Sequence, residues 1–169
     1  MPKAVLIGPP GAGKSSVGRQ LAKLLSCEIL DTDLEIERKS GKKISEIFTD
    51  DGEVAFRAIE KTIVLEALQS AAGVVALGGG SVLDLDVADF LSKSAIPIAY
   101  LEVSISQAAP RVGFNKERPL LTINPRQQWM ALMEKRRPIY ESLATFTIAT
   151  DNRKPAEVAQ EIATSIGAK

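Results

Sequence analysis

The chain has 169 residues, of which 45% are hydrophobic, and this suits one compact domain with a real core. Its 21 basic and 21 acidic residues balance, which argues against nucleic acid or an anionic membrane as the main partner. A single cysteine excludes an internal disulfide, and no signal pattern or membrane-length apolar stretch occurs, so we expect a cytoplasmic protein. Because nothing in the sequence marks an extra apolar face, we also expect a monomer.

Short apolar runs alternate with segments of helical periodicity along the chain. The expected strands are residues 3–8, 28–30, 74–77, 96–103 and 146–150. The expected helices are 14–25 (with Val17, Leu21, Leu24 and Leu25 at helical spacing), 53–68 (with Phe56, Ile59, Ile63 and Ala67 on one face), 127–140 and 155–166. This alternation predicts an α/β fold, with a parallel sheet covered on both faces. The polar segment 113–125 lacks periodicity and predicts a lid.

The first loop, GPPGAGKSS, matches the pattern G-x-x-x-x-G-K-[ST] between an expected strand and an expected helix. Its backbone N–H groups and the helix N-terminus would hold a polyphosphate, Lys14 would neutralise the β- and γ-phosphates, and Ser15 would ligate Mg²⁺. The pattern therefore predicts binding of a nucleoside triphosphate. The expected contacts are Gly11, Ala12, Gly13, Lys14, Ser15 and Ser16.

Two carboxylates, Asp31 and Asp33, follow the second expected strand. In an extended chain, residues i and i+2 point the same way, so one could support Mg²⁺ while the other orients or deprotonates an attacking hydroxyl. The alternative is that Asp33 is only the N-cap of the helical segment LEIERK. The spacing alone leaves both interpretations open.

Three consecutive glycines and several arginines complete the candidate site. Gly78, Gly79 and Gly80 follow the third expected strand, where they would leave room for a ligand against the backbone, although a permissive turn is the alternative. Arg57 could form a plain surface pair with Glu60, and Arg136 could serve a helix end. Arginine is also the usual ligand for carboxylates and transferred phosphoryl groups. The spacing assigns no individual role to Arg57, Arg111, Arg118 and Arg136.

The segments GPPGAGKS, DTD, GEVAFRAIE, LGGGSV, RPLL and KRRPIYE, in this order, resemble the shikimate kinase family. The resemblance implies a nucleoside monophosphate kinase-like P-loop fold, a three-layer α/β sandwich around a five-stranded parallel sheet. It implies a single domain, residues 1–169, with a substrate-binding helical region at about 32–60 and a lid at about 112–125. It also implies ATP- and Mg²⁺-dependent phosphorylation of the 3-hydroxyl of shikimate, a step toward chorismate and the aromatic amino acids.

The resemblance also implies individual roles. Lys14 would bind phosphate, Ser15 and Asp31 would support Mg²⁺, and Asp33 would hold the shikimate hydroxyls and act as the candidate base. Arg57 and Arg136 would clamp the substrate carboxylate beside the Gly78–Gly80 backbone, and Phe48 and Phe56 would wall the ring. Arg118 would be the lid arginine that reaches the transferred phosphate. Arg111, Arg153 and Pro155 would flank the adenine.

Two rival functions remain at this point. A kinase for another small hydroxy acid, such as gluconate, would share the loop and the fold. A GTP-dependent switch protein would suit the size, but no D-x-x-G occurs, and the only near match to N-K-x-D is NKER at Asn115.

Overall fold

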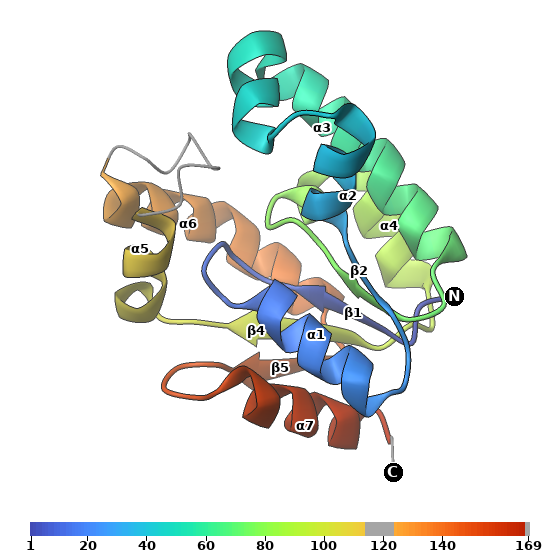
Figure 1. Cartoon of the computed structure of the whole chain (residues 1–169). Helices are drawn as coiled ribbons and strands as arrows, with labels where there is room; N and C mark the ends of the chain where they lie inside the picture. Colours follow the sequence, from blue (N-terminus) through green and yellow to red (C-terminus); the bar gives the residue numbers. More distant parts are fainter. Residues whose placement is uncertain (114–123, 168–169) are drawn as a thin grey trace.

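The apolar runs pair into one parallel sheet in the computed structural model, which describes residues 1–113 and 124–167 (Figure 1). The strands are β1 (Ala4–Ile7), β2 (Ile29–Asp31), β3 (Val74–Ala76), β4 (Ile98–Glu102) and β5 (Phe146–Ala149). Their order is β2-β3-β1-β4-β5, and Leu6 of β1 lies level with Ala76 of β3 and Ala99 of β4. The chain leaves β1 toward β2 on one side and later crosses from β3 to β4 on the other side of β1, which opens a crevice at the carboxyl ends of the central strands.

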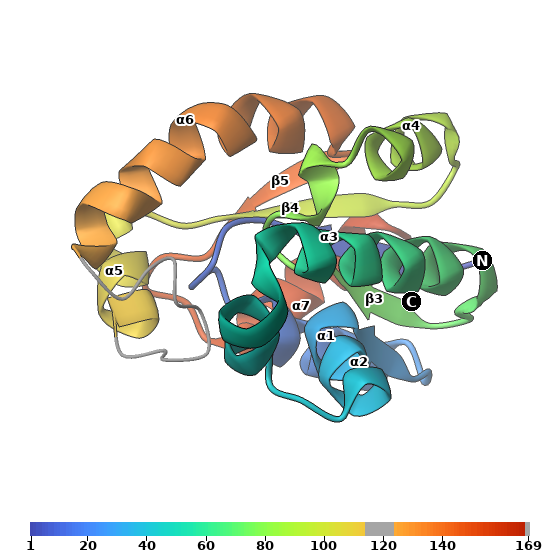
Figure 2. The ribbon, with the colours of Figure 1, turned by 90° about the horizontal axis from the view of Figure 1, so that it is seen from above.

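Helices cover both faces of this sheet (Figure 2). They are α1 (Lys14–Leu24), α2 (Thr32–Ser40), α3 (Ile44–Ser70), the 3₁₀ turn η1 (Ser81–Leu83), α4 (Leu85–Lys93), α5 (Ile105–Gly113), α6 (Pro125–Leu143) and α7 (Pro155–Ser165). The α1 and α7 helices pack together on one face, while α4 and α6 lie on the other. The expected three-layer α/β sandwich around a five-stranded parallel sheet is confirmed.

The expected strands and helices are present, with ends that differ by at most three residues, except that α3 begins at Ile44 rather than at Glu53. Two helices, α4 and α5, were not predicted. Within α1, Val17 and Leu21 are buried as expected, but Leu24 is 46% exposed, so its place on the buried face was wrong. It is the last residue of the helix, which is capped at Leu25.

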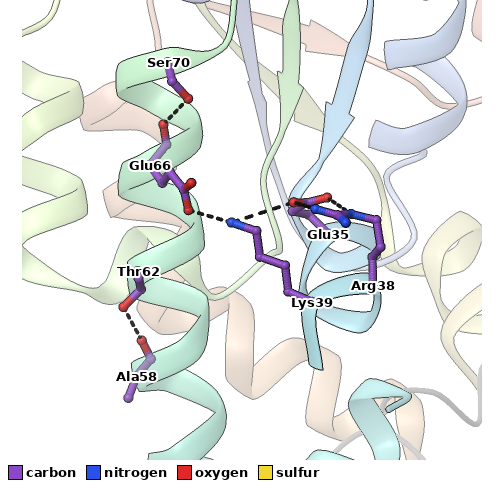
Figure 3. Close-up of polar contacts among 7 residues, drawn as sticks. All are labelled: Glu35, Arg38, Lys39, Ala58, Thr62, Glu66 and Ser70. Carbon is purple, nitrogen blue, oxygen red and sulfur yellow. Dashed lines mark hydrogen bonds and ion pairs between the residues drawn. The ribbon is translucent and has the colours of Figure 1, made fainter. Parts of the chain in front are cut away.

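The α2 and α3 helices form a unit with a small core of its own. Its buried side chains are Ile36, Ile44, Ile47, Phe56 and Ile63. On its surface, Lys39 of α2 forms an ion pair of 2.6 Å with Glu66 of α3, as Figure 3 shows. Exposed pairs of this kind stabilise a fold by at most about 1 kcal/mol, so the apolar contacts hold the two helices together.

The long α3 helix is broken at Gly52, whose φ of 87° and ψ of 170° are non-helical. The break separates the segment that carries Phe48 from the longer segment that carries Phe56 and Arg57. The predicted helix beginning at Glu53 therefore matches the second segment, and the first, which begins at Ile44, is an additional short helix. Among the residues that the structure describes, no helix has the length and apolarity needed to cross a membrane.

Candidate active site

The loop between β1 and α1 wraps around the N-terminus of α1. Gly11 has a φ of 85°, and a Cβ atom there would lie 3.1 Å from the backbone of Ala108 in α5, so only glycine fits without strain. Lys14 is 8% exposed, and its Nζ donates to the carbonyl oxygens of Gly8 (2.7 Å) and Pro9 (3.0 Å). The lysine is thus held at the centre of the loop that it was predicted to serve.

Asp31 joins this loop to the end of β2. The Ser15 hydroxyl donates a short hydrogen bond to the Asp31 carboxylate, which also accepts from the backbone N–H groups of Asp33 (3.0 Å) and Leu34 (3.3 Å). Asp31 is therefore the N-cap of α2, and the alternative that gave this role to Asp33 was wrong. The extended geometry expected for Asp31 and Asp33 was also wrong, because the helix begins at Thr32.

A cavity of about 220 Å³ opens between these elements. Its lining residues come from the loop (Pro10, Gly11, Gly13, Lys14, Ser15 and Ser16), from the first turn of α2 and the strand end before it (Asp31 and Asp33), from β3 and the residue after it (Ala76 and Leu77), and from α5 (Arg111). Arg111 donates to the carbonyl oxygen of Gly11 at 2.8 Å. Ala12, by contrast, is buried within the loop. The cavity wall therefore carries positively charged side chains together with hydroxyl and carboxylate oxygens that could ligate a metal ion.

Each of the three consecutive glycines lies against a different charged side chain. A Cβ atom at Gly78 would lie 2.6 Å from Asp33 Oδ1, one at Gly79 would lie 3.3 Å from Arg136 Nη1, and one at Gly80 would lie 2.5 Å from Arg57 Nη1. None of the three has a positive φ. The segment needs glycine because the charged groups approach the backbone closely, so the permissive turn considered as an alternative does not account for it.

Arg57 is held by Glu60 in a partly buried ion pair of 2.7 Å, rather than in the surface pair considered as an alternative. Glu60 is only 4% exposed, and its burial raises the pKa of the carboxyl above its ordinary value, although the Arg57 guanidinium acts in the opposite direction. The same guanidinium lies 5.2 Å from the ring centre of Phe56, and the Phe48 ring lies 4.6 Å from that of Phe56. The predicted aromatic wall and Arg57 are therefore neighbours.

Arg136 does not serve the end of its helix, because α6 continues for seven more residues to Leu143. Instead the side chain is buried, at 5% exposure, and it lies against Gly79, next to the glycine that Arg57 approaches. Two guanidinium groups from different helices thus meet one glycine segment.

The remaining predicted residues lie farther out. Arg153 forms an ion pair with Glu161 (2.5 Å) and donates to the Ala149 carbonyl oxygen (2.8 Å), and Pro155 begins α7. Neither residue lines the 220 Å³ cavity, although their loop leaves the same edge of the sheet and contacts α5 through Gln107 and Asn152 (3.3 Å). Arg118 and most of the predicted lid, residues 114–123, lie outside the described residues.

Sequence reasoning missed the buried side chains that connect these parts. The Thr32 hydroxyl is fully buried, donates to the Ala76 carbonyl oxygen (3.3 Å) and accepts from the Gly78 N–H (3.1 Å), so it ties the aspartates to the glycines. From α6, Trp129 donates to the Pro10 carbonyl oxygen in the phosphate loop (residues 8–16), and Tyr140 donates to the Gly79 carbonyl oxygen in the glycine segment. The only signals in the sequence were the position of Thr32 between two aspartates and the presence of one tryptophan.

Known proteins with the same sequence pattern and fold are shikimate kinases. A family model described as shikimate kinase matches residues 10–167. The shikimate kinase of Thermobifida fusca is 52% identical, over 99% of this chain and 96% of that protein, and that of Rhodococcus jostii is 48% identical, over 95% of each. A solved structure, shikimate kinase from Acinetobacter baumannii in complex with shikimate, aligns with a TM-score of 0.93 and 40% identity, over 98% of this chain and 93% of that one. The chain therefore belongs to the shikimate kinase family.

Proposed function

We propose that this protein transfers the γ-phosphoryl group of ATP to the 3-hydroxyl of shikimate, giving ADP and shikimate 3-phosphate. The observation that carries the proposal is the glycine segment, against which two carboxylates (Asp33 and Glu60) and two guanidinium groups lie at close range. That arrangement suits a small anionic molecule with hydroxyl groups, and it stands next to the loop that suits a polyphosphate. The A. baumannii protein with 40% identity is a shikimate kinase solved in complex with shikimate.

On the nucleotide side, the loop N–H groups and the N-terminus of α1 would hold the phosphates, and Lys14 would neutralise the β- and γ-phosphates. Gly11, Ala12, Gly13 and Ser16 would contribute the rest of the loop. Arg111 lies at the edge of the cavity, where it would contact the nucleotide. We also assign Arg153 and Pro155 to the adenine, on the loop that contacts α5.

The Ser15 hydroxyl and the Asp31 carboxylate fit a Mg²⁺ site, because they are hard oxygen donors that share one hydrogen bond at the cavity wall. No group of three or more acidic, cysteine or histidine side chains that could hold a metal ion occurs within residues 1–113 and 124–167. That agrees with Mg²⁺, which binds through one or two protein oxygens, water and substrate phosphates. When bound, the ion would neutralise charge on the β- and γ-phosphate oxygens.

On the acceptor side, Arg57 and Arg136 would grip the shikimate carboxylate, with Gly79 and Gly80 beside it. Phe48 and Phe56 would form the wall against the ring. The region that holds the acceptor would then be residues 32–60, within the α2–α3 unit that has its own small core. We assign residues 112–125 to a lid that closes over the site, with Arg118 stabilising the transferred phosphoryl group.

In the reaction, the acceptor oxygen attacks the γ-phosphorus and the bond to the β,γ-bridging oxygen breaks, so that ADP leaves with the bond's electron pair. The acceptor's proton passes to Asp33, whose carboxylate lies at the Gly78 backbone and on the wall of the nucleotide cavity. Asp33 can therefore reach a hydroxyl held between the two halves of the site. Such transfers need mainly positioning and charge neutralisation, and a closed lid would exclude competing water.

A substrate panel tests the proposal. We expect phosphorylation of shikimate with ATP and Mg²⁺, and no comparable turnover of gluconate or with GTP. The Asp33→Asn variant should retain ATP affinity while losing turnover by a factor on the order of 10² or more. Turnover of gluconate but not shikimate would overturn the substrate assignment, and GTP-selective binding without small-molecule phosphorylation would favour a switch protein.

A further inference from the structure

The α6 helix presents one buried face to both halves of the site. Trp129, Met133, Arg136 and Tyr140 follow at spacings of four, three and four residues, which places them on one side of a helix. Their exposed fractions are 3%, 4%, 5% and 0%. Figure 2 shows α6 running along one face of the sheet, from beside α5 toward α4. The helix therefore spans the region in which the two loops meet.

Trp129 is hydrogen-bonded to the nucleotide side of the site. Its indole Nε1 donates a buried hydrogen bond of 3.0 Å to the carbonyl oxygen of Pro10. Pro10 belongs to the phosphate loop and lines the cavity with Lys14 and Ser15. A proline has no N–H group, so its carbonyl is the only backbone group through which this residue can be hydrogen-bonded.

Tyr140 is hydrogen-bonded to the acceptor side of the site. Its hydroxyl donates a buried hydrogen bond of 2.5 Å to the carbonyl oxygen of Gly79, the central glycine of the segment. Its ring stacks on Tyr100 of β4, with centroids 5.1 Å apart. The Tyr140 side chain is therefore packed against the sheet, and its hydrogen bond holds the glycine segment, which has no side chains that could do so.

The two loops also touch each other. A Cβ atom at Gly79 would lie 3.1 Å from Pro10 Cδ, so the carbonyl groups that Trp129 and Tyr140 hold belong to residues in direct contact. Arg136 lies between them on the same face. Both loops are therefore hydrogen-bonded to the same helix, α6, at positions on either side of Arg136.

We propose that Trp129 and Tyr140 are positioning residues, of which Trp129 fixes the phosphate loop and Tyr140 fixes the glycine segment, each from α6. This inference rests on the proposed function. Trp129 acts on the nucleotide and Tyr140 acts on the acceptor, each through a backbone carbonyl, and neither residue touches the reacting atoms. Their loss therefore affects the two substrates separately.

The test compares Trp129→Phe with Tyr140→Phe. We expect Trp129→Phe to raise KM for ATP about three- to tenfold with little change in KM for shikimate, and Tyr140→Phe to do the reverse. Calorimetric titration with each substrate alone should show the same division in Kd. Tyr100→Phe is the matched control, because it deletes a buried hydroxyl from the stacked ring without touching either loop, and it should change neither KM.

A purely structural role would lower Tm and change both KM values together, and that result, or equal effects from Tyr100→Phe, would overturn the inference. If Trp129→Phe does not fold, 3-benzothienylalanine at position 129 removes the N–H donor while keeping the bicyclic shape. Because the chain has one tryptophan, that replacement changes a single site. If the wild type fails to phosphorylate shikimate, the proposed function fails, while the ATP titration still decides the role of Trp129.

Discussion

At the scale of single residues, Gly80 is the position where an added methyl group should affect binding most specifically. In Gly80→Ala, the new Cβ would lie 2.5 Å from Arg57 Nη1, so the guanidinium must move. We expect KM for shikimate to rise about tenfold, because a charge-assisted contact with the carboxylate is displaced, and KM for ATP to stay nearly constant. Steady-state kinetics with each substrate varied in turn measures both values.

Gly18→Ala is the control for this prediction. A Cβ there would also lie 2.5 Å from a side-chain atom, the Cδ1 of Ile29, but in the contact between α1 and β2. It should lower Tm without changing either KM. An equal rise in KM for shikimate in both variants would show that Gly80→Ala acts through general destabilisation instead.

Glu60 should make stability depend on pH. Burial raises its pKa above the ordinary value of 4.5 in the folded state, so the folded protein binds this proton more tightly than the unfolded chain. The resulting stabilisation is complete below pH 4.5 and is lost as the pH rises through the folded pKa. Relative to Glu60→Gln, the free energy of unfolding of the wild type should therefore decline over that range. Urea unfolding at several pH values measures the free energy of unfolding of both proteins. A wild-type advantage over Glu60→Gln that grows with pH would contradict a raised pKa for Glu60.

Several site residues were predictable one by one, because their chemistry is encoded locally. The phosphate loop is of this kind: Lys14 and Ser15 follow from a pattern of adjacent residues, and the structure places both on one cavity wall. The surroundings of Arg57 and Arg136 were not predictable in the same way. Their burial depends on which helices meet the glycine segment, and no local spacing contains that information.

At the scale of elements, the break in α3 offers a prediction about backbone strain. Gly52 has a φ of 87° and a ψ of 170°, a conformation that only glycine adopts readily, and a Cβ there would meet nothing within 4 Å. Gly52→Ala should therefore destabilise the protein by about 1–3 kcal/mol through strain alone. It should also raise KM for shikimate, because the segment with Phe48 changes its angle to the segment with Phe56.

Chemical unfolding and steady-state kinetics measure these two effects. The matched control is Gly167→Ala, which also has a positive φ (77°) and open space, but lies beyond α7. It should reduce stability without changing KM. An unchanged KM for shikimate in Gly52→Ala would mean that the angle between the two segments does not shape the acceptor site.

Sequence reasoning missed the helices α4 and α5 for different reasons. The α4 helix carries a recognisable signal, since Asp84 caps it by accepting from Asp86 and Val87 N–H groups, and Val87 and Leu91 are buried four residues apart. The α5 helix contains Pro110, which ordinarily argues against a helix. Its position is set by packing against α6 and the phosphate loop, so tertiary contacts override the local preference.

At the scale of the whole molecule, the alternation of strands and helices was sufficient to predict a parallel sheet covered on both faces. It was not sufficient to give the order β2-β3-β1-β4-β5, which was not predicted, because strand order depends on which strands pair in the folded chain. That order brings the phosphate loop, the Asp31–Asp33 turn and the glycine segment to one edge. Residues from three distant parts of the sequence thus form one site.

The close approach of charged groups to the three glycines has a consequence for protein engineering. A Cβ atom at Gly78 or Gly80 would lie within 3.0 Å of Asp33 or Arg57, so a side chain introduced there displaces a charged group of the site. Phe48 offers a better starting point, because it is only partly buried, whereas Phe56 belongs to the small core and lies against the Arg57 guanidinium. A library built on position 48 would explore bulkier or slimmer cyclic acids while Arg57 keeps its aromatic neighbour.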